Sequence, residues 1–130
     1  MTLNCAIIDD EPLALEMMSD YVQKTPFLTL TGAYNSAVQA IKTIRENPVD
    51  LLFLDIQMPE LSGLEFAKVL PKRTKVVFTT AFPQYAVEGY EVEAFAYILK
   101  PISHEAFLKV AKRAYDWFSQ SEKAKNYAKD

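Results

Sequence analysis

Five short apolar runs are spread along the chain, and each has the length of a β-strand. Helical patterns, with apolar residues at i, i+3, i+4 and i+7, lie between these runs and after the last one. Five strands that alternate with five helices predict an α/β fold, with a parallel sheet and helices on both of its faces. The apolar runs are residues 4–9, 27–34, 50–55, 75–80 and 95–100.

The helical patterns have clear stop and start signals. Pro26, Pro48 and Pro71 each follow a helical pattern, where a helix has to end. Ser103 stands at the position that caps the last helix. We expect the apolar stripe of that helix to be core rather than a cofactor site. The stripe consists of Phe107, Val110, Ala111, Ala114, Trp117 and Phe118.

Composition limits the class of protein. A chain of 130 residues is long enough for one domain with a buried hydrophobic core. Its net charge of −3 does not indicate binding to nucleic acid or to an anionic membrane. The single cysteine, Cys5, excludes an internal disulfide and fits a reducing cytosol. The sequence has neither a long apolar span nor a signal pattern, so we expect a cytoplasmic protein. Residues 120–130 are polar, and we expect a frayed helix end, a linker or an artificial chain end there.

Polar residues follow four of the five apolar runs at the point where each run ends. Asp9 and Asp10 end the first run, Asp55 the third, Thr80 the fourth and Lys100 the fifth. In open parallel sheets, ligands bind beyond the carboxyl ends of the strands, where the strand order reverses. We therefore expect these side chains to meet at one edge of the sheet.

Three carboxylates at one edge would repel one another. Two unit charges about 4 Å apart cost on the order of 4 kcal/mol at an effective dielectric constant of about 20. Oxygen ligands without histidine or cysteine favour a hard ion, and open water positions favour Mg²⁺. Lys100 and Thr80 would add a cation and a hydrogen-bond donor for a phosphoryl group. Asp55 is then the expected nucleophile, forming a mixed anhydride.

Each of these residues also has an ordinary structural explanation. Asp9 and Asp10 could cap the first helix and favour its dipole. Thr80 could be a β-branched strand residue, Lys100 a solvated strand end, and Asp55 the beginning of a turn. The combination of all of them on four strand ends, in this order, favours the phosphoryl site.

Four stretches resemble the signature of the receiver domain of two-component response regulators, over about residues 3–118. The resemblance implies a doubly wound, flavodoxin-like sheet of five parallel strands in the order 2-1-3-4-5, within a receiver domain at residues 1–119. It implies a phosphorylation-switched signalling domain rather than an ordinary enzyme. Such a domain takes its phosphoryl group from a partner sensor histidine kinase, and it catalyses its own phosphotransfer and dephosphorylation with Mg²⁺. The stretches are IIDDEP, LLFLDIQMPELSG, FTTA and YILKP.

The resemblance also assigns roles around the metal. It implies that Asp55 is the phosphoacceptor. Asp9 and Asp10 would bind Mg²⁺, the second of them directly. Asp55 itself and the backbone carbonyl of Gln57 would be further ligands.

Further roles concern the phosphoryl group and the switch. By the same resemblance, Thr80 is the switch hydroxyl and Lys100 the lysine that contacts the phosphate. Lys100-Pro101 is expected to be a cis peptide bond, and Tyr97 matches an aromatic residue that changes rotamer on activation. Gly63 matches a glycine in the loop after the phosphoacceptor, where a backbone without Cβ is tolerated.

The stretch FTTAFPQYAVEGYEVEAFAYILKPI is similar to the receivers of LytTR (LytR/AlgR) regulators, whose second domain binds DNA. This likeness implies transcription regulation through a DNA-binding domain that we expect to be absent from this chain. Phe82 departs from the pattern, because many relatives carry a tyrosine there.

We further expect a homodimer on phosphorylation, through the fourth helix, the fifth strand and the fifth helix. The aromatic-rich segment there contains Tyr85, Val87, Tyr90 and Val92.

Other functions fit the residues less well. A phosphatase of the haloacid-dehalogenase type needs a D-x-D pair on the first strand, whereas Asp55 is on the third and Gln57 stands two residues after it. A degenerate receiver that only binds a partner would not need the complete set of acids, threonine and lysine. Nucleotide binding lacks a Gly-rich phosphate loop. We expect His104, the single histidine, to lie on the surface, so the phosphodonor histidine belongs to another protein.

Overall fold

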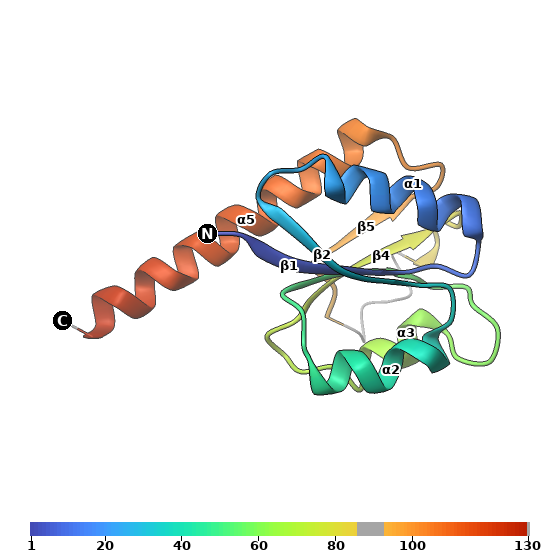
Figure 1. The fold of residues 1–130 in the computed structure, drawn as a ribbon, viewed down its shortest axis with the longest axis horizontal. Helices are drawn as coiled ribbons and strands as arrows, with labels where there is room; N and C mark the ends of the chain where they lie inside the picture. The colour runs from blue at the N-terminus through green and yellow to red at the C-terminus, as the bar shows by residue number, and fades with distance from the viewer. Residues whose placement is uncertain (86–92, 130) are drawn as a thin grey trace.

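A parallel sheet of five strands forms the centre of the molecule, in the order β2-β1-β3-β4-β5 (Figure 1). The structure, a computed structural model, describes residues 1–85 and 93–129, of which 123–129 by their backbone alone. All adjacent strands are parallel, which confirms the predicted doubly wound, flavodoxin-like α/β fold. The strands are β1 (Leu3–Ile8), β2 (Leu28–Tyr34), β3 (Leu51–Asp55), β4 (Lys75–Thr80) and β5 (Ala96–Leu99).

The helices cover both faces of the sheet. Helices α1 and α5 pack on one face, and α2 and α3 pack on the other (Figure 1). The expected helix between β4 and β5, with Val87, Tyr90 and Val92, lies outside the described residues. The described helices are α1 (Pro12–Gln23), α2 (Ala37–Glu46), α3 (Gly63–Ala67) and α5 (His104–Lys129).

The central strands are apolar throughout because both of their faces are covered. On β3, Leu51 and Phe53 belong to the core under α1 and α5, whereas Leu52 and Leu54 belong to the core beside α2 and α3. A strand that is buried on both faces has no solvent side to carry alternating polar residues. This burial explains why the run before Asp55 is continuously apolar.

Helix α5 begins as the sequence predicts. The Ser103 hydroxyl accepts a hydrogen bond from the Ala106 backbone N–H, at 3.0 Å, as a cap should. Phe107 and Ala114 are fully buried. The prediction of a core position is wrong for Trp117, whose side chain is 41% exposed. The reason is that α5 is longer than the sheet beneath it and extends past the edge of the body (Figure 1).

The polar segment at the end of the chain is helical. Helix α5 continues to Lys129, so residues 120–129 add turns to the helix that protrudes from the body (Figure 1). Within the part of the chain that the structure describes, none of the helices has an apolar stretch long enough to span a membrane.

Candidate metal and phosphoacceptor site

The residues singled out in the sequence come together at the carboxyl edge of the sheet. Asp55 and Thr80 are the last residues of β3 and β4, and Asp9 and Lys100 directly follow β1 and β5. Strand β1 pairs with β2 on one side and with β3 on the other, so the strand order reverses at this point. The site therefore lies where doubly wound sheets bind ligands.

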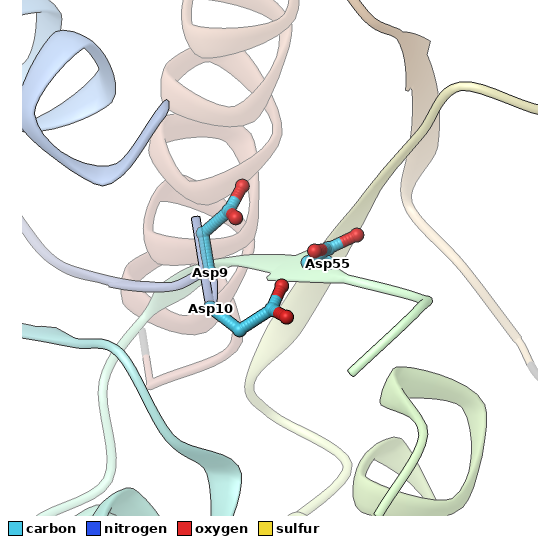
Figure 2. A group of neighbouring side chains, drawn as sticks. All are labelled: Asp9, Asp10 and Asp55. Atoms are coloured by element: carbon cyan, nitrogen blue, oxygen red, sulfur yellow. The ribbon is translucent and has the colours of Figure 1, made fainter. Parts of the chain in front are cut away.

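Three carboxylates form the centre of this site. Asp9, Asp10 and Asp55 each contribute an oxygen atom, and these atoms lie within 4.8 Å of one another (Figure 2). Asp9 and Asp55 are only 2% and 4% exposed, whereas Asp10 lies open to solvent. Oxygen donors in a partly open cluster suit a hard divalent cation that keeps several water ligands. The donor set therefore fits Mg²⁺.

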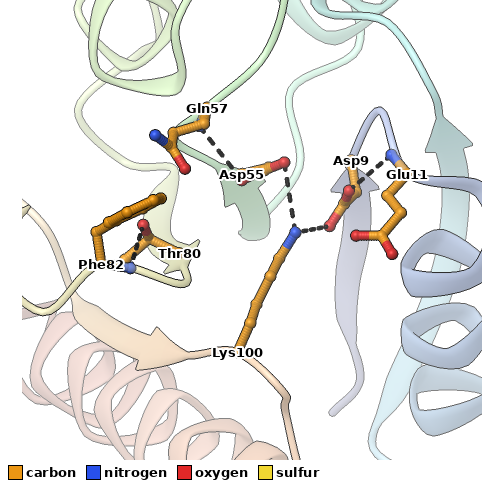
Figure 3. A network of polar contacts seen from close by, with 7 residues as sticks. All are labelled: Asp9, Glu11, Asp55, Gln57, Thr80, Phe82 and Lys100. Atoms are coloured by element: carbon orange, nitrogen blue, oxygen red, sulfur yellow. Dashed lines mark hydrogen bonds and ion pairs between the residues drawn. The ribbon is translucent and has the colours of Figure 1, made fainter.

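The side chain of Lys100 joins two of the acids (Figure 3). Its Nζ lies 2.9 Å from Asp9 Oδ2 and 3.4 Å from Asp55 Oδ2. Burial by itself lowers the pKa of Lys100, but the hydrogen bond to Asp9 and the negative charges of Asp55 and Asp9 outweigh it and raise the pKa. Lys100 therefore stays cationic and offsets part of the repulsion between the carboxylates.

The pKa of the Asp55 carboxyl group is raised. Burial, followed by the negative charge of Asp9, raises the pKa of Asp55 from an ordinary 3.8 to about 7, although Lys100 acts in the opposite direction. Without a metal ion, a large share of Asp55 is thus protonated near neutral pH. A bound divalent cation would favour the ionised form, which is the form that can act as a nucleophile.

Backbone groups fix the orientation of both buried carboxylates (Figure 3). Asp9 Oδ1 accepts a hydrogen bond from the Glu11 backbone N–H at 2.9 Å, and Asp55 Oδ1 accepts one from the Gln57 backbone N–H at 3.3 Å. In each acid, one oxygen binds the backbone and the other binds Lys100. Gln57 thus lies directly beside the cluster, and its role as a carbonyl ligand stays a prediction.

Thr80 and Tyr97 occupy different positions relative to the acids. The Thr80 hydroxyl is buried and accepts a hydrogen bond from the Phe82 backbone N–H at 3.1 Å (Figure 3). The Tyr97 ring packs against Phe78 on β4, with ring centroids 5.4 Å apart, and burial raises its pKa. Tyr97 thus packs against β4, and its role in switching stays a prediction.

Two backbone features complete the site. The Lys100-Pro101 peptide bond is cis, which is the form that the resemblance implies. Gly63 approaches the backbone of the phosphoacceptor candidate so closely that an added Cβ would overlap the Asp55 carbonyl oxygen. None of the described glycines has a positive φ, so the lack of space requires glycine here rather than an unusual conformation. The resemblance singles out Gly63, but its close approach to the end of β3 is visible only in the structure.

We expect Gly63→Ala to destabilise the protein by about 1–3 kcal/mol, because the new methyl group meets backbone that cannot rotate away. Urea denaturation measures the change. Gly32→Ala is the matched control, since its methyl group would meet the ring of Tyr34, a side chain that can turn. A Gly63→Ala protein as stable as the parent would contradict the close approach.

Comparison with known proteins identifies the family. The family model for the response regulator receiver domain matches residues 5–112. The chain is 39% identical over 113 residues to an uncharacterised response regulatory protein of Shewanella oneidensis, across 85% of this chain and 48% of that protein. It is 41% identical over 109 residues to the transcriptional regulatory protein BtsR of Escherichia coli, across 82% and 46%. The chain thus spans about half the length of these relatives.

Solved structures agree with the family match. The response regulatory domain of mrkE from Klebsiella pneumoniae has a TM-score of 0.82 and 30% identity to this chain, and the match covers 90% of this chain and 98% of that one. The signature stretches, the strand order and the family match all lead to the same assignment. The chain belongs to the receiver domains of two-component response regulators.

Proposed function

We propose that this chain accepts a phosphoryl group on Asp55 from a partner histidine kinase in a Mg²⁺-dependent reaction. One observation carries the proposal. Lys100 bridges Asp9 and Asp55 at the point where the strand order reverses, within a cluster of three carboxylates. This arrangement combines a nucleophile, a fixed cation and an oxygen-rich place for a hard divalent ion.

The transfer step follows from these groups. A carboxylate oxygen of Asp55 attacks the phosphorus atom of the phosphohistidine, the new P–O bond forms, and the P–N bond to the histidine breaks. Asp9, Asp10, Asp55 and the Gln57 carbonyl would hold Mg²⁺, which when bound would neutralise charge on the phosphoryl oxygens. Lys100 offsets further charge. The same groups would assist the attack of water on the acyl phosphate, which returns Asp55 to its free form.

An apolar groove beside the acids suits the approach of a kinase. It has a volume of about 430 Å³ and is lined by Leu13, Met17, Lys100 and Pro101, among others. Leu13 is 76% exposed, so a partner can bury it. His104, the single histidine, is exposed and stacks on Tyr21, and the proposed phosphodonor is a histidine of another protein.

Acetyl phosphate, a small phosphodonor, tests the proposal directly. With Mg²⁺ present, the protein is expected to gain the mass of one acid-labile phosphoryl group. Removal of Mg²⁺ with a chelator is expected to prevent this gain, because the carboxylates then repel the incoming phosphate. Intact-protein mass spectrometry measures the product. The absence of any gain with Mg²⁺ would refute the proposed function.

The signal is proposed to leave the site through Thr80 and Tyr97. A phosphoryl group on Asp55 offers a new acceptor to the Thr80 hydroxyl, which can donate one hydrogen bond while it accepts another. In the present structure the Thr80 hydroxyl is hydrogen-bonded to the backbone of the loop at Phe82. Movement of that loop toward the phosphoryl group would open space for Tyr97 to turn inward. Because the Tyr97 ring packs against Phe78 and close-packed side chains do not deform gradually, we expect the change to be two-state.

The output is proposed to be a LytTR-type DNA-binding domain that regulates transcription. The support is the resemblance of the stretch from Phe78 to Ile102 to LytTR receivers, together with relatives about twice as long as this chain. One of these relatives is named a transcriptional regulatory protein. DNA would then be bound through that second domain rather than through this one.

We expect beryllofluoride, a phosphate mimic, to shift the Mg²⁺-loaded domain from monomer to homodimer. The edge strand β5 carries the 50% exposed Leu99, which offers apolar surface to a second copy. Analytical ultracentrifugation with and without the mimic measures the shift. Leu99→Glu is expected to oppose it, whereas Leu13→Glu, on α1, serves as a control with the same chemical change. A monomer under all conditions would favour release of the output domain instead.

A further inference from the structure

A second concave site lies at the other edge of the sheet. It is a groove of about 540 Å³ between the turn before β4, the residues before β5, and α5. The amino ends of β4 and β5 border it, whereas Asp55, Thr80 and Lys100 lie at the carboxyl ends. No residue of the phosphoacceptor site lines this groove. We call it the basic groove, and its principal residues are Lys68, Lys72, Lys75, Phe95, Arg113 and Trp117.

The described residues that line the basic groove have a net charge opposite to that of the whole chain. Among them are four cations and one carboxylate, that of Glu93, although the protein as a whole carries −3. All ion pairs among the described residues involve either Lys24 or Lys100. The four cations of the groove therefore have no carboxylate partner in the described part of the chain. Unpaired cations around a concave surface attract anions.

Two of the cations are held in place by aromatic rings. Lys75 Nζ lies 4.4 Å from the centroid of the Trp117 ring, and Arg113 Cζ lies 5.2 Å from that of Phe95. These cation–π contacts restrict two long side chains before any ligand arrives, which lowers the entropic cost of binding. Trp117 is 41% exposed at this place, so part of its surface is open to a ligand.

We propose that the basic groove binds a small organic anion that carries a planar ring, which is the chemistry of a nucleotide. The phosphates pair with the lysines and Arg113, and the ring packs against the exposed part of Trp117. The volume of the groove falls within the range of about 300–1,000 Å³ that is common for small-molecule sites. No Gly-rich loop is needed, because side chains of residues 68–75 and of Arg113 on α5 supply the positive charge.

The fluorescence of Trp117 provides a direct test, because it is the single tryptophan of the chain. The probe is ATP, added without Mg²⁺ so that the carboxylate site is not engaged. We expect a saturable change in fluorescence, and calorimetry checks the affinity independently. Adenosine offers the ring without charge, and inorganic triphosphate offers charge without the ring. Each is expected to bind at least tenfold more weakly than ATP.

Charge-reversal variants locate the binding. Lys72→Glu and Arg113→Glu are each expected to weaken ATP binding at least tenfold, because they remove a cation and add an anion in the groove. Lys42→Glu makes the same change in net charge on the exposed surface of α2 and is expected to leave the affinity unchanged. Circular dichroism confirms that the variants are folded, and phosphorylation by acetyl phosphate should be unaffected in all of them.

Four results would overturn the inference. One is the absence of a saturable response to ATP at millimolar concentration. Another is triphosphate binding as tightly as ATP, which would indicate a simple anion site. Tighter binding of a hexaglutamate peptide would indicate an acidic protein segment as the occupant. Equal weakening by Lys42→Glu would show that only the net charge matters.

Discussion

Asp55→Asn protein is expected to gain no phosphoryl group from acetyl phosphate and Mg²⁺, whereas the parent gains one. The amide has nearly the same shape as the carboxylate and can still accept the hydrogen bond from Gln57 through its oxygen. It lacks the negative charge and the nucleophilic oxygen that form the acyl phosphate. Loss of labelling would thus follow from lost chemistry rather than from a change in the fold. Intact-protein mass spectrometry measures it.

Asp20→Asn is the matched control for this loss. Asp20 is exposed on α1, and its ion pair with Lys24 is an ordinary surface contact. This variant is expected to be labelled as fully as the parent. If Asp55→Asn protein were labelled equally well, another residue would be the phosphoacceptor and the assignment of Asp55 would be wrong.

The second large effect is expected for metal binding. Asp10→Ala should weaken Mg²⁺ binding at least tenfold, because it removes the most accessible oxygen donor of the three-carboxylate cluster. Titration calorimetry measures the affinity. Glu122→Ala, an exposed change on α5, removes one negative charge far from the cluster and should have little effect. Equal Mg²⁺ affinity in the two variants would contradict the site.

The Asp10→Ala change is also expected to affect the stability of the metal-free protein. Removing Asp10 relieves repulsion within the cluster, so the metal-free protein is expected to become more stable in urea.

In the parent, Mg²⁺ affinity should increase as the pH rises through about 7, since the ion must displace the proton that Asp55 retains. An affinity that is constant between pH 6 and pH 8 would show that Asp55 is already ionised without the metal.

Local patterns in the sequence are sufficient to predict the α/β architecture and the placement of the candidate site residues at the strand ends. Strand and helix periods are local properties, and a continuously apolar run such as residues 51–54 indicates burial on both faces. A charged residue directly after such a run, like Asp55, marks the end of a strand. The carboxyl ends of parallel strands share one edge, so the positions of Asp9, Thr80 and Lys100 along the chain already predict that they lie near Asp55.

The interactions among these groups depend on the tertiary structure. The pairing of Ile8 with Leu54 brings Asp9 beside Asp55, and Lys100 reaches both of them from the end of the edge strand β5. The raised pKa of Asp55 depends on these distances and on burial, because electrostatic energies vary with separation and with the surrounding dielectric. A sequence contains neither quantity.

Packing between segments that are distant in the sequence also decides which side chains are exposed and which ones form the basic groove. The apolar stripe of α5 predicts Trp117 as core, but the helix extends beyond the sheet and leaves this ring partly exposed. The basic groove likewise combines Lys72, Phe95 and Arg113, from three segments that no local pattern connects. Periodicity shows which face of an element is apolar, whereas the length of its neighbours decides whether that face is covered.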